Sequence, residues 1–202
     1  MQKVTDTKRQ ILAVAGELFK RFGFDKTSMD DIAQKAHKAK RSIYNHFAGK
    51  EELFGTIIGN ELDHIRTTLQ PVFDRTELPA ADRMKEYMIQ RMELLNHADI
   101  YKQMLRNEIG TSIDLRFENV HRICNNFDEW ERTQFKRIAA EGATSHLSPE
   151  FSVDAFAGMM QMVLKSLEIS FFVQDKYKQY AATFSTFVGC VVESLVAQNT
   201  IK

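Results

Sequence analysis

The sequence predicts an all-α protein of about nine helices, divided into a small basic module and a larger acidic one. Only 3 Pro and 9 Gly occur in 202 residues and 44% of the residues are hydrophobic, which favours long helices around a sizeable core. Residues 1–50 carry 11 Lys and Arg against 5 Asp and Glu, whereas residues 51–202 carry 16 against 22. A net charge of zero therefore hides a basic first quarter, which favours contact with a polyanion.

The two cysteines, Cys124 and Cys190, have neither disulfide-scaffold nor metal-ligand spacing, so we expect reduced thiols and no metal site or cofactor. The first ten residues are polar and charged, which predicts no secretory leader. The most apolar stretch, residues 151–173, is interrupted by charged residues such as Asp154 and Lys165. We therefore expect a buried or interface helix rather than a membrane span, in a cytoplasmic protein.

The first helix is expected over residues 7–22, where apolar side chains recur at helical spacing. Thr7, with Gln10 three residues later, is typical of a capping box that starts a helix. Gly23 follows the last apolar position, as is typical of a helix C-terminus.

Two short helices follow. Ser28, with Asp31 three residues later, predicts the start of the second helix, which extends through about residue 36. A turn at residues 37–39 then leads to a third helix over about residues 40–47.

A long fourth helix is expected to start at Lys50 and to end at Gln70, because Pro71 cannot continue it. This helix links the two modules directly, and we place the domain boundary at its start, giving domains 1–49 and 50–202. The remaining helices are expected at residues 80–96, 98–108, 112–140, 152–173 and 177–198.

Two short helices joined by a tight turn in a basic segment form a helix-turn-helix pattern, whose second helix lies in the major groove of DNA. In the predicted third helix Ile43 and Phe47 share one face, four residues apart. Arg41 and Asn45 point the opposite way, and these residue types can recognise guanine and adenine edges. By itself the pattern fits a solvated face on an ordinary three-helix domain about equally well.

Other residues of this segment are placed to reach phosphate groups. Lys40, Ser42, Tyr44 and His46 flank the Arg41 and Asn45 face, whereas Thr27, Ser28 and Lys50 lie at helix N-termini, where backbone N–H groups favour anions. Together with Arg41 and Asn45 they form the predicted DNA-binding set.

Residues 9–54, RQILAVAGELFKRFGFDKTSMDDIAQKAHKAKRSIYNHFAGKEELF, resemble the N-terminal signature of TetR/AcrR-type transcriptional regulators. The shared features are Arg9, Ile11-Leu12, Ala15, Leu18-Phe19, Gly23, Thr27, Ile32-Ala33, Tyr44, His46-Phe47, Lys50-Glu51 and Leu53. The resemblance implies an all-α homodimer with a three-helix DNA-binding domain and a C-terminal helical domain for ligand binding and dimerisation. It also implies that Lys40, Arg41, Tyr44, Asn45, His46 and Lys50 match positions that contact DNA.

The expected function is that of a regulator that binds a near-palindromic, double-stranded operator and responds to a small hydrophobic or amphipathic ligand. Repression is the usual outcome in the family, and activation is the alternative. The turn departs from the usual Ala-Gly-Val-Ser of the family, because this chain has Ala36-His37-Lys38-Ala39. His37 must then adopt the positive φ that suits glycine. Ala39 lacks the capping hydroxyl of serine, which costs about 1 kcal/mol of local helix stability.

Apolar stripes on the last two expected helices predict dimer contacts, since these helices pair with the partner chain in the family. The residues in question are Phe156, Met159, Leu167, Phe171, Phe184, Phe187, Val191 and Leu195. A plain intramolecular core remains the alternative for these stripes.

Methionine and aromatic residues are frequent in the predicted C-terminal domain and suit a pocket for apolar ligands, although each one alone fits ordinary core packing. The predicted lining is Met88, Met92, Met104, Glu108, Phe117, His121, Phe127, Met160 and Val163.

Three other functions stay open at this point. An enzyme is disfavoured because the sequence has no catalytic constellation and no phosphate-binding glycine loop. A binder that coats DNA without sequence choice fits the basic charge, but it does not need Arg41 and Asn45 to face the bases. A regulator with a filled core and no ligand remains possible.

Overall fold

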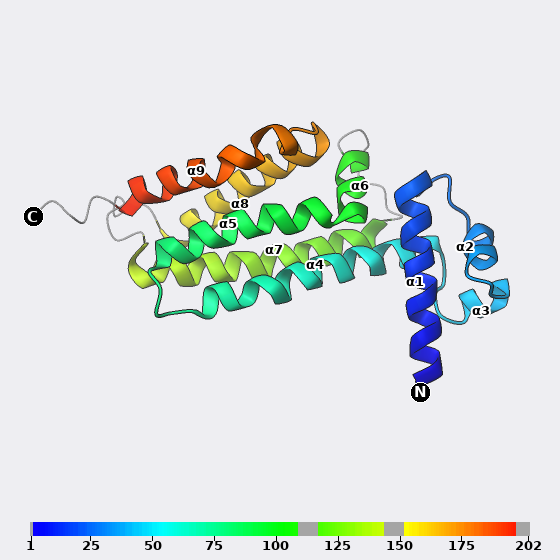
Figure 1. Ribbon diagram of the computed structural model, residues 1–202. Helices are drawn as coiled ribbons and strands as arrows, with labels where there is room; N and C mark the ends of the chain where they lie inside the picture. The colour runs from blue at the N-terminus through cyan, green and yellow to red at the C-terminus, as the bar shows by residue number, and fades with distance from the viewer. Residues whose placement is uncertain (1, 109–116, 144–151, 197–202) are drawn as a thin grey trace, which may run out of the picture. The chain divides into compact units, whose positions relative to one another are not determined.

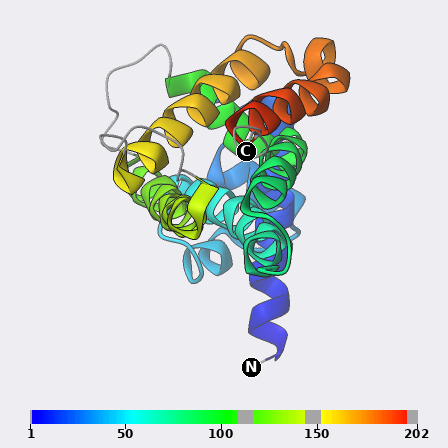
Figure 2. The same cartoon turned by 90° about the vertical axis from the view of Figure 1, so that its left-hand side faces the viewer.

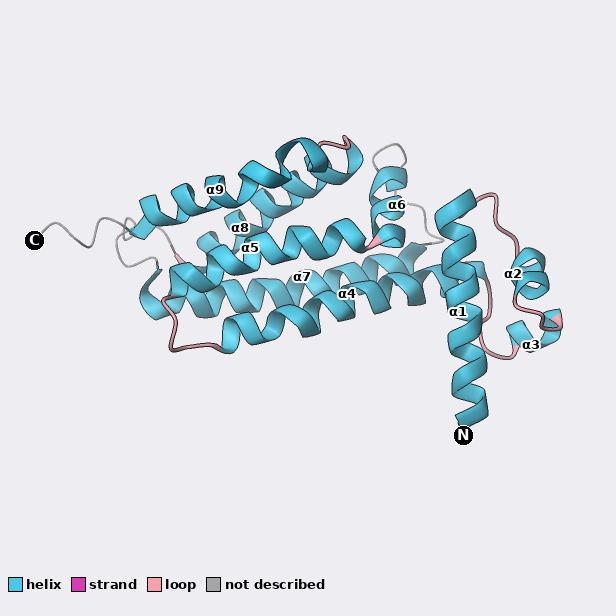
Figure 3. Ribbon diagram, viewed as in Figure 1, coloured by secondary structure: helices cyan, strands magenta, loops and turns pink. Residues whose placement is uncertain are grey.

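The computed structural model describes residues 2–108, 117–143 and 152–196, and within these ranges it contains helices and no strand (Figure 3). The α-helices are α1 (Gln2–Phe22), α2 (Met29–Lys35), α3 (Lys40–Tyr44), α4 (Lys50–Asp74), α5 (Ala80–His97), α6 (Asp99–Glu108), α7 (Glu118–Ile138), α8 (Val153–Glu168) and α9 (Tyr177–Val196). Two π-helical segments, η2 (Ala139–Ala143) and η3 (Ile169–Val173), extend α7 and α8. The predicted all-α class is confirmed.

The chain packs as two compact units, of which unit 1 comprises residues 1–62 and 98–124 and unit 2 comprises residues 63–97 and 125–202. Helices α4 and α7 each begin in unit 1 and continue into unit 2. The domain boundary at residues 49 and 50 remains a functional prediction, whereas by packing unit 1 also includes the start of α4 and the whole of α6.

Helix α1 begins at Gln2 instead of at residue 7, so the predicted capping box at Thr7 is wrong. The residues before Thr7 continue the helical turn, and a residue inside a helix cannot cap it. The other end is as predicted: the N–H of Gly23 donates to Phe19 O at 2.8 Å, and Gly23 has φ of 84°.

Pro71 does not end α4 as predicted, because the helix continues to Asp74. Proline removes one backbone hydrogen bond, but here it lies in the last turns of the helix. Val72 and Phe73 directly after it are 4% and 1% exposed, so burial of these side chains holds the last turn in helical form.

Four phenylalanines form the centre of unit 1. The rings of Phe19, Phe24, Phe54 and Phe117 pack against one another, with centroid separations of 4.9–5.9 Å. Phe19 belongs to α1 and Phe54 to α4, whereas Phe24 precedes α2 and Phe117 precedes α7. Their packing therefore joins distant parts of the sequence in one core.

Helix α6 is held to α1 and α4 by polar contacts within unit 1. The carboxylate of Glu61 accepts the backbone N–H groups of Ile100 and Tyr101 at 3.1 and 2.8 Å, which satisfies donors at the start of α6. The amide of Gln103 donates to Phe19 O at 2.8 Å, and Lys20 pairs with Asp99 at 2.6 Å. The C-terminal end of α1 is therefore tied to α6 by side chains.

In unit 2 the long helices run alongside one another in both views (Figures 1 and 2), and α5 packs along α9. A buried ion network crosses three of them. Arg91 of α5 lies 2.5 Å from Glu131 of α7 and 2.5 Å from Glu168 of α8. All three side chains are at most 1% exposed, so each charge depends on the others for solvation.

Two neighbouring groups complete this network. Tyr87 donates its hydroxyl to Glu131; burial, together with the charge of Glu131, raises the pKa of Tyr87 well above its ordinary value, so the phenol stays neutral. Burial lowers the pKa of Lys165, but the carboxylates of Glu168 and Asp128 outweigh burial and hold its pKa above the usual range. Lys165 therefore stays charged, 2.9 Å from Asp128.

One segment, Val153–Val173, is long and apolar enough to cross a membrane by length and composition alone, a test that the core helix of a soluble protein also passes. In this fold the segment carries Lys165 and Glu168, whose charges face partners on α5 and α7. Its ion pairs fit the prediction of a buried or interface helix.

Candidate nucleic-acid interface and apolar cavity

Helix α2 starts as predicted. Ser28 is its N-cap, and the Ser28 hydroxyl accepts the N–H of Asp31 at 3.1 Å while the Asp31 carboxylate accepts the N–H of Ser28 at 2.9 Å. The Ser28 hydroxyl also donates to the Asp31 carboxylate at 2.6 Å, and this bond, together with the one from the Ser28 N–H, lowers the pKa of Asp31, which stays ionised. The start of the helix-turn-helix is thus fixed locally.

The turn between α2 and α3 is built on a left-handed residue. His37 has φ of 52°, the left-handed conformation that suits glycine and that was expected at this position. Its N–H donates to Gln34 O at 3.1 Å, and the N–H of Lys38 donates to Ala33 O at 3.0 Å. These two bonds satisfy carbonyl groups at the end of α2, so the chain keeps the tight turn without glycine.

Ala39 is the N-cap of α3 and makes no side-chain capping hydrogen bond. Its ψ of 142° is the extended conformation from which a serine hydroxyl accepts an N–H of the first turn. We expect Ala39→Ser to raise the free energy of unfolding by about 1 kcal/mol, measured by urea denaturation of the full chain. Ala39→Val fits the same backbone but cannot cap, so it serves as the control; an equal gain in both variants would contradict the capping explanation.

Helix α3 ends at Tyr44, earlier than the predicted residue 47, with Asn45 as its C-cap. The predicted orientation holds nevertheless. Ile43 and Phe47 are 0% and 1% exposed, whereas Arg41 and Asn45 lie on the solvent side. The helix thus fixes its inner face by packing and leaves two base-reading residue types free to meet a partner.

The residues around this face differ in their availability. Lys40 and Tyr44 are exposed, while Ser42 and His46 are half-buried. Lys40 pairs with Asp30 of α2 at 2.8 Å, and the hydrogen bond to Asp30 raises its pKa. Lys40 is therefore charged, and its ion pair links α3 to α2.

Two predicted phosphate contacts are occupied within unit 1. Thr27 is 2% exposed, and its hydroxyl donates to Gly23 O at 2.8 Å, so this side chain positions the segment before α2 and does not face a partner. The Lys50 amine donates to Phe24 O at 2.8 Å and lies 4.2 Å from the centre of the Phe24 ring. A phosphate contact by Lys50 would have to share that amine with Phe24.

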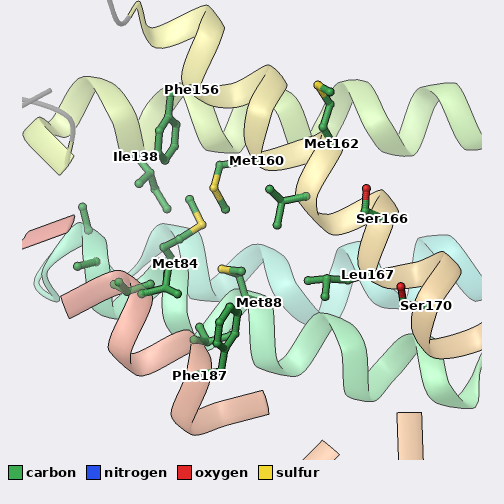
Figure 4. A pocket seen from close by; sticks show the side chains of 16 residues that line it. Met84, Met88, Ile138, Phe156, Met160, Met162, Ser166, Leu167, Ser170 and Phe187 are labelled. Atoms are coloured by element: carbon green, nitrogen blue, oxygen red, sulfur yellow. The ribbon is translucent and has the colours of Figure 1, made fainter. Parts of the chain in front are cut away.

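An apolar cavity of about 640 Å³ lies in unit 2 between α5, α8, α9 and the end of α7 (Figure 4). Met84, Met88 and Met160 point toward one another across it, and Ser166 and Ser170 supply the side-chain hydroxyls of its described lining. The described residues that line it are Ala80, Ala81, Met84, Met88, Ile138, Phe156, Met160, Met162, Val163, Ser166, Leu167, Ser170, Phe187, Val188, Val191 and Val192. Among the described residues, no charged side chain lines this cavity.

The predicted ligand lining is only partly assembled. Met88, Met160 and Val163 do line the cavity, whereas Met92 and Phe127 do not and are 0% and 5% exposed. Met104, Phe117 and His121 belong to unit 1 and not to this cavity, and the side chain of Glu108 lies outside the described part of the chain. This cavity therefore does not bring all nine residues together, because α6 and the start of α7 pack in unit 1, and a ligand pocket lined by the nine stays a prediction.

The predicted dimer stripe also divides into two sets. Phe156, Phe171 and Phe184 are at most 8% exposed, and the Phe171 and Phe184 rings pack 5.3 Å apart within the protomer, so these three are core residues. Met159, Phe187 and Val191 are exposed, and Leu167 is half-buried. The side chain of Leu195 lies outside the described residues.

The family model described as "Bacterial regulatory proteins, tetR family" matches residues 11–57. The HTH-type transcriptional repressor DhaR of a Mycobacterium species is 21% identical over 170 residues, which cover 82% of this chain and 84% of DhaR. Other curated relatives are matched over smaller shares, from 32% to 66% of their own length.

Solved structures agree in fold over nearly the whole chain. NalD, the secondary repressor of the MexAB-OprM multidrug efflux pump in Pseudomonas aeruginosa, has a TM-score of 0.73 at 17% identity and covers 98% of this chain and 97% of its own. FadR from Bacillus subtilis, solved in complex with stearoyl-CoA, has a TM-score of 0.70 at 17% identity and covers 93% of this chain and 97% of its own. These likenesses establish the arrangement of helices.

Proposed function

This chain belongs to the TetR family of bacterial DNA-binding transcription regulators, a family without enzymatic activity, and from that premise we propose that it is a repressor controlled by an apolar ligand. It acts in the cytoplasm, where its operator lies. Unit 1 binds the operator and unit 2 binds the ligand.

The observation that carries the DNA-binding proposal is the division of α3 into two faces. Ile43 is fully buried, while Arg41 and Asn45 are exposed. Arg41 then reads guanine O6 and N7 in the major groove, and Asn45 reads adenine N6 and N7. Ser28, Lys40, Ser42, Tyr44 and His46 hold the neighbouring phosphates, with Lys50 joining them when it shares its amine with Phe24.

A single helix of five residues reads few base pairs, so we propose that two copies bind together. A two-fold dimer places its α3 helices in successive major grooves, about 34–36 Å apart, and therefore recognises a near-palindromic operator. The exposed residues Met159, Phe187 and Val191 supply the core of the dimer contact.

The ligand proposed for the cavity is an apolar molecule with few polar atoms. The cavity volume of about 640 Å³ suits a drug-sized or acyl ligand, and within the described lining Ser166 and Ser170 are the side chains that offer hydrogen bonds. FadR binds an acyl-CoA; in this chain the uncharged lining would accept the acyl part of such a molecule and would not hold its charged phosphates inside.

Ligand binding weakens operator binding when the ligand prefers a dimer whose α3 helices no longer match the groove spacing. Helix α4 is the proposed connection, because its residues belong to both units. The size of the effect equals the difference in ligand affinity between the two states.

Selection of binding sites from random double-stranded DNA tests the proposed function without knowledge of the natural operator. We expect enrichment of two inverted copies of a short motif, with centres about 10 base pairs apart. Recovery of unrelated sequences, with binding that depends on salt alone, would instead indicate a protein that coats DNA without sequence choice.

A further inference from the structure

The cavity in unit 2 is open on the side where the most exposed apolar side chains lie. Its lining includes Met162, Phe187, Val163 and Val191, which are 71%, 59%, 48% and 40% exposed. On its inner side Val188 and Phe156 are at most 8% exposed. The inner side of the cavity is therefore lined by buried side chains, whereas the side chains at its mouth are exposed to solvent.

The exposed apolar residues extend beyond the cavity mouth on the same helices. Seven of the nine large hydrophobic side chains that are exposed in the described residues lie on α8, η3 and α9, which marks this face as a contact surface. The seven are Met159, Met162, Val163, Ile169, Tyr180, Phe187 and Val191. We call this set the α8–α9 face.

The charge pattern of the α8–α9 face indicates what covers it. Residues 155–164 of α8 and 179–192 of α9 contain no Asp, Glu, Lys or Arg. Such a face offers no charge complementarity to an acidic or basic partner, and it matches another uncharged apolar surface. A second copy of the chain presents that surface, and two-fold pairing brings the same patch against itself.

Resting on the proposed function, we infer that a second copy of this chain covers the cavity mouth and completes the ligand site. The same residues then serve two purposes: Met162, Phe187 and Val191 contact both the ligand and the partner protomer. A ligand in the completed site buries apolar surface that the separate protomer leaves in water. The dimer therefore binds ligand more tightly than the monomer, and by reciprocity the ligands in the two symmetry-related sites tighten the dimer by the square of that factor.

The test uses the fluorescent apolar probe 1-N-phenylnaphthylamine and the substitution Met159→Glu. Met159 is 54% exposed on the α8–α9 face but does not line the cavity, so a charge there disrupts pairing and leaves the protomer's own cavity wall intact. Ser185→Glu adds the same charge about 200° around α9 from Phe187 and is the matched control. Sedimentation equilibrium gives the dimer Kd, and probe titration gives the probe Kd.

We expect the wild type and Ser185→Glu to bind the probe about tenfold more tightly as dimers than as monomers, and saturating probe in both sites to tighten the dimer about 100-fold. Met159→Glu should lose both effects. If circular dichroism finds this variant unfolded, Ile169→Glu, also on the face and outside the lining, provides the same test.

Each contrary result has a distinct meaning. If monomeric Met159→Glu binds the probe as tightly as the wild-type dimer, the inference fails while the ligand cavity of the proposed function stands. If no form of the protein binds the probe, the proposed ligand site fails and this inference fails with it. If the wild-type protein stays monomeric at high concentration, the inference fails, because no second copy covers the cavity mouth.

Discussion

Arg91→Leu is expected to lower the free energy of unfolding by about 3–5 kcal/mol, because it leaves two carboxylates in the interior without their cation. Glu131 and Glu168 are 0% and 1% exposed, and each lies 2.5 Å from an Arg91 nitrogen. Lys165 then remains 3.9 Å from Glu168. Urea denaturation followed by circular dichroism measures the loss.

Two further variants show whether the loss comes from the unpaired charges. Arg66→Leu is the same substitution at an arginine whose ion pair with Asp63 is half exposed. We expect it to change the free energy of unfolding by less than about 1 kcal/mol. Replacing Arg91, Glu131 and Glu168 together by leucine should recover most of the stability lost in the single variant. A loss below about 1 kcal/mol in Arg91→Leu would contradict the described network.

Arg41→Ala is expected to weaken binding to the selected operator by about 30-fold or more, the equivalent of about 1 kcal/mol or more in each of two half-sites, and to leave binding to random DNA almost unchanged. One bidentate contact to guanine contributes about 1–3 kcal/mol of discrimination, and a dimer loses it in both half-sites. Fluorescence anisotropy at fixed salt measures both affinities, and repeat selection should show relaxed preference at the guanine position.

Lys26→Ala is the control for this variant, because Lys26 is an exposed cation of unit 1 that does not lie on α3. If Arg41 contacts phosphate instead of a base, Arg41→Ala would weaken all DNA sequences equally and would reduce the salt dependence by about one phosphate contact. That result would show that Arg41 does not recognise a base.

The helix-turn-helix was predictable because its signals are local. Ser28 and Asp31 form their capping box within four residues, and the spacing of Ile43 and Phe47 fixes which face of α3 turns inward. The length of α4 was less predictable, since Pro71 is a local stop signal that burial of Val72 and Phe73 overrides. Sequence patterns therefore predicted the features that depend on residues close together in the chain, and they failed where tertiary burial decides.

The cavity and the ion network could not be predicted in the same way. Met88 and Met104 look alike in sequence, but one faces the cavity and the other packs in unit 1, because the chain crosses between units after α5. The partners of Arg91 are 40 and 77 residues away, a separation at which helical spacing carries no information. The internal burial of Phe171 and Phe184 likewise follows from tertiary packing.

The measurement that tests the central claim most directly is fluorescence-anisotropy binding of the wild-type protein to the DNA upstream of its own gene, at physiological salt with excess random competitor. A sequence-specific regulator of this kind typically binds its site at least 1000-fold more tightly than random DNA, so we expect binding to survive the competitor and to be lost in Arg41→Ala and Asn45→Ala. Binding that disappears with competitor, or that both variants retain in full, would contradict the assignment of α3 as the helix that reads the operator.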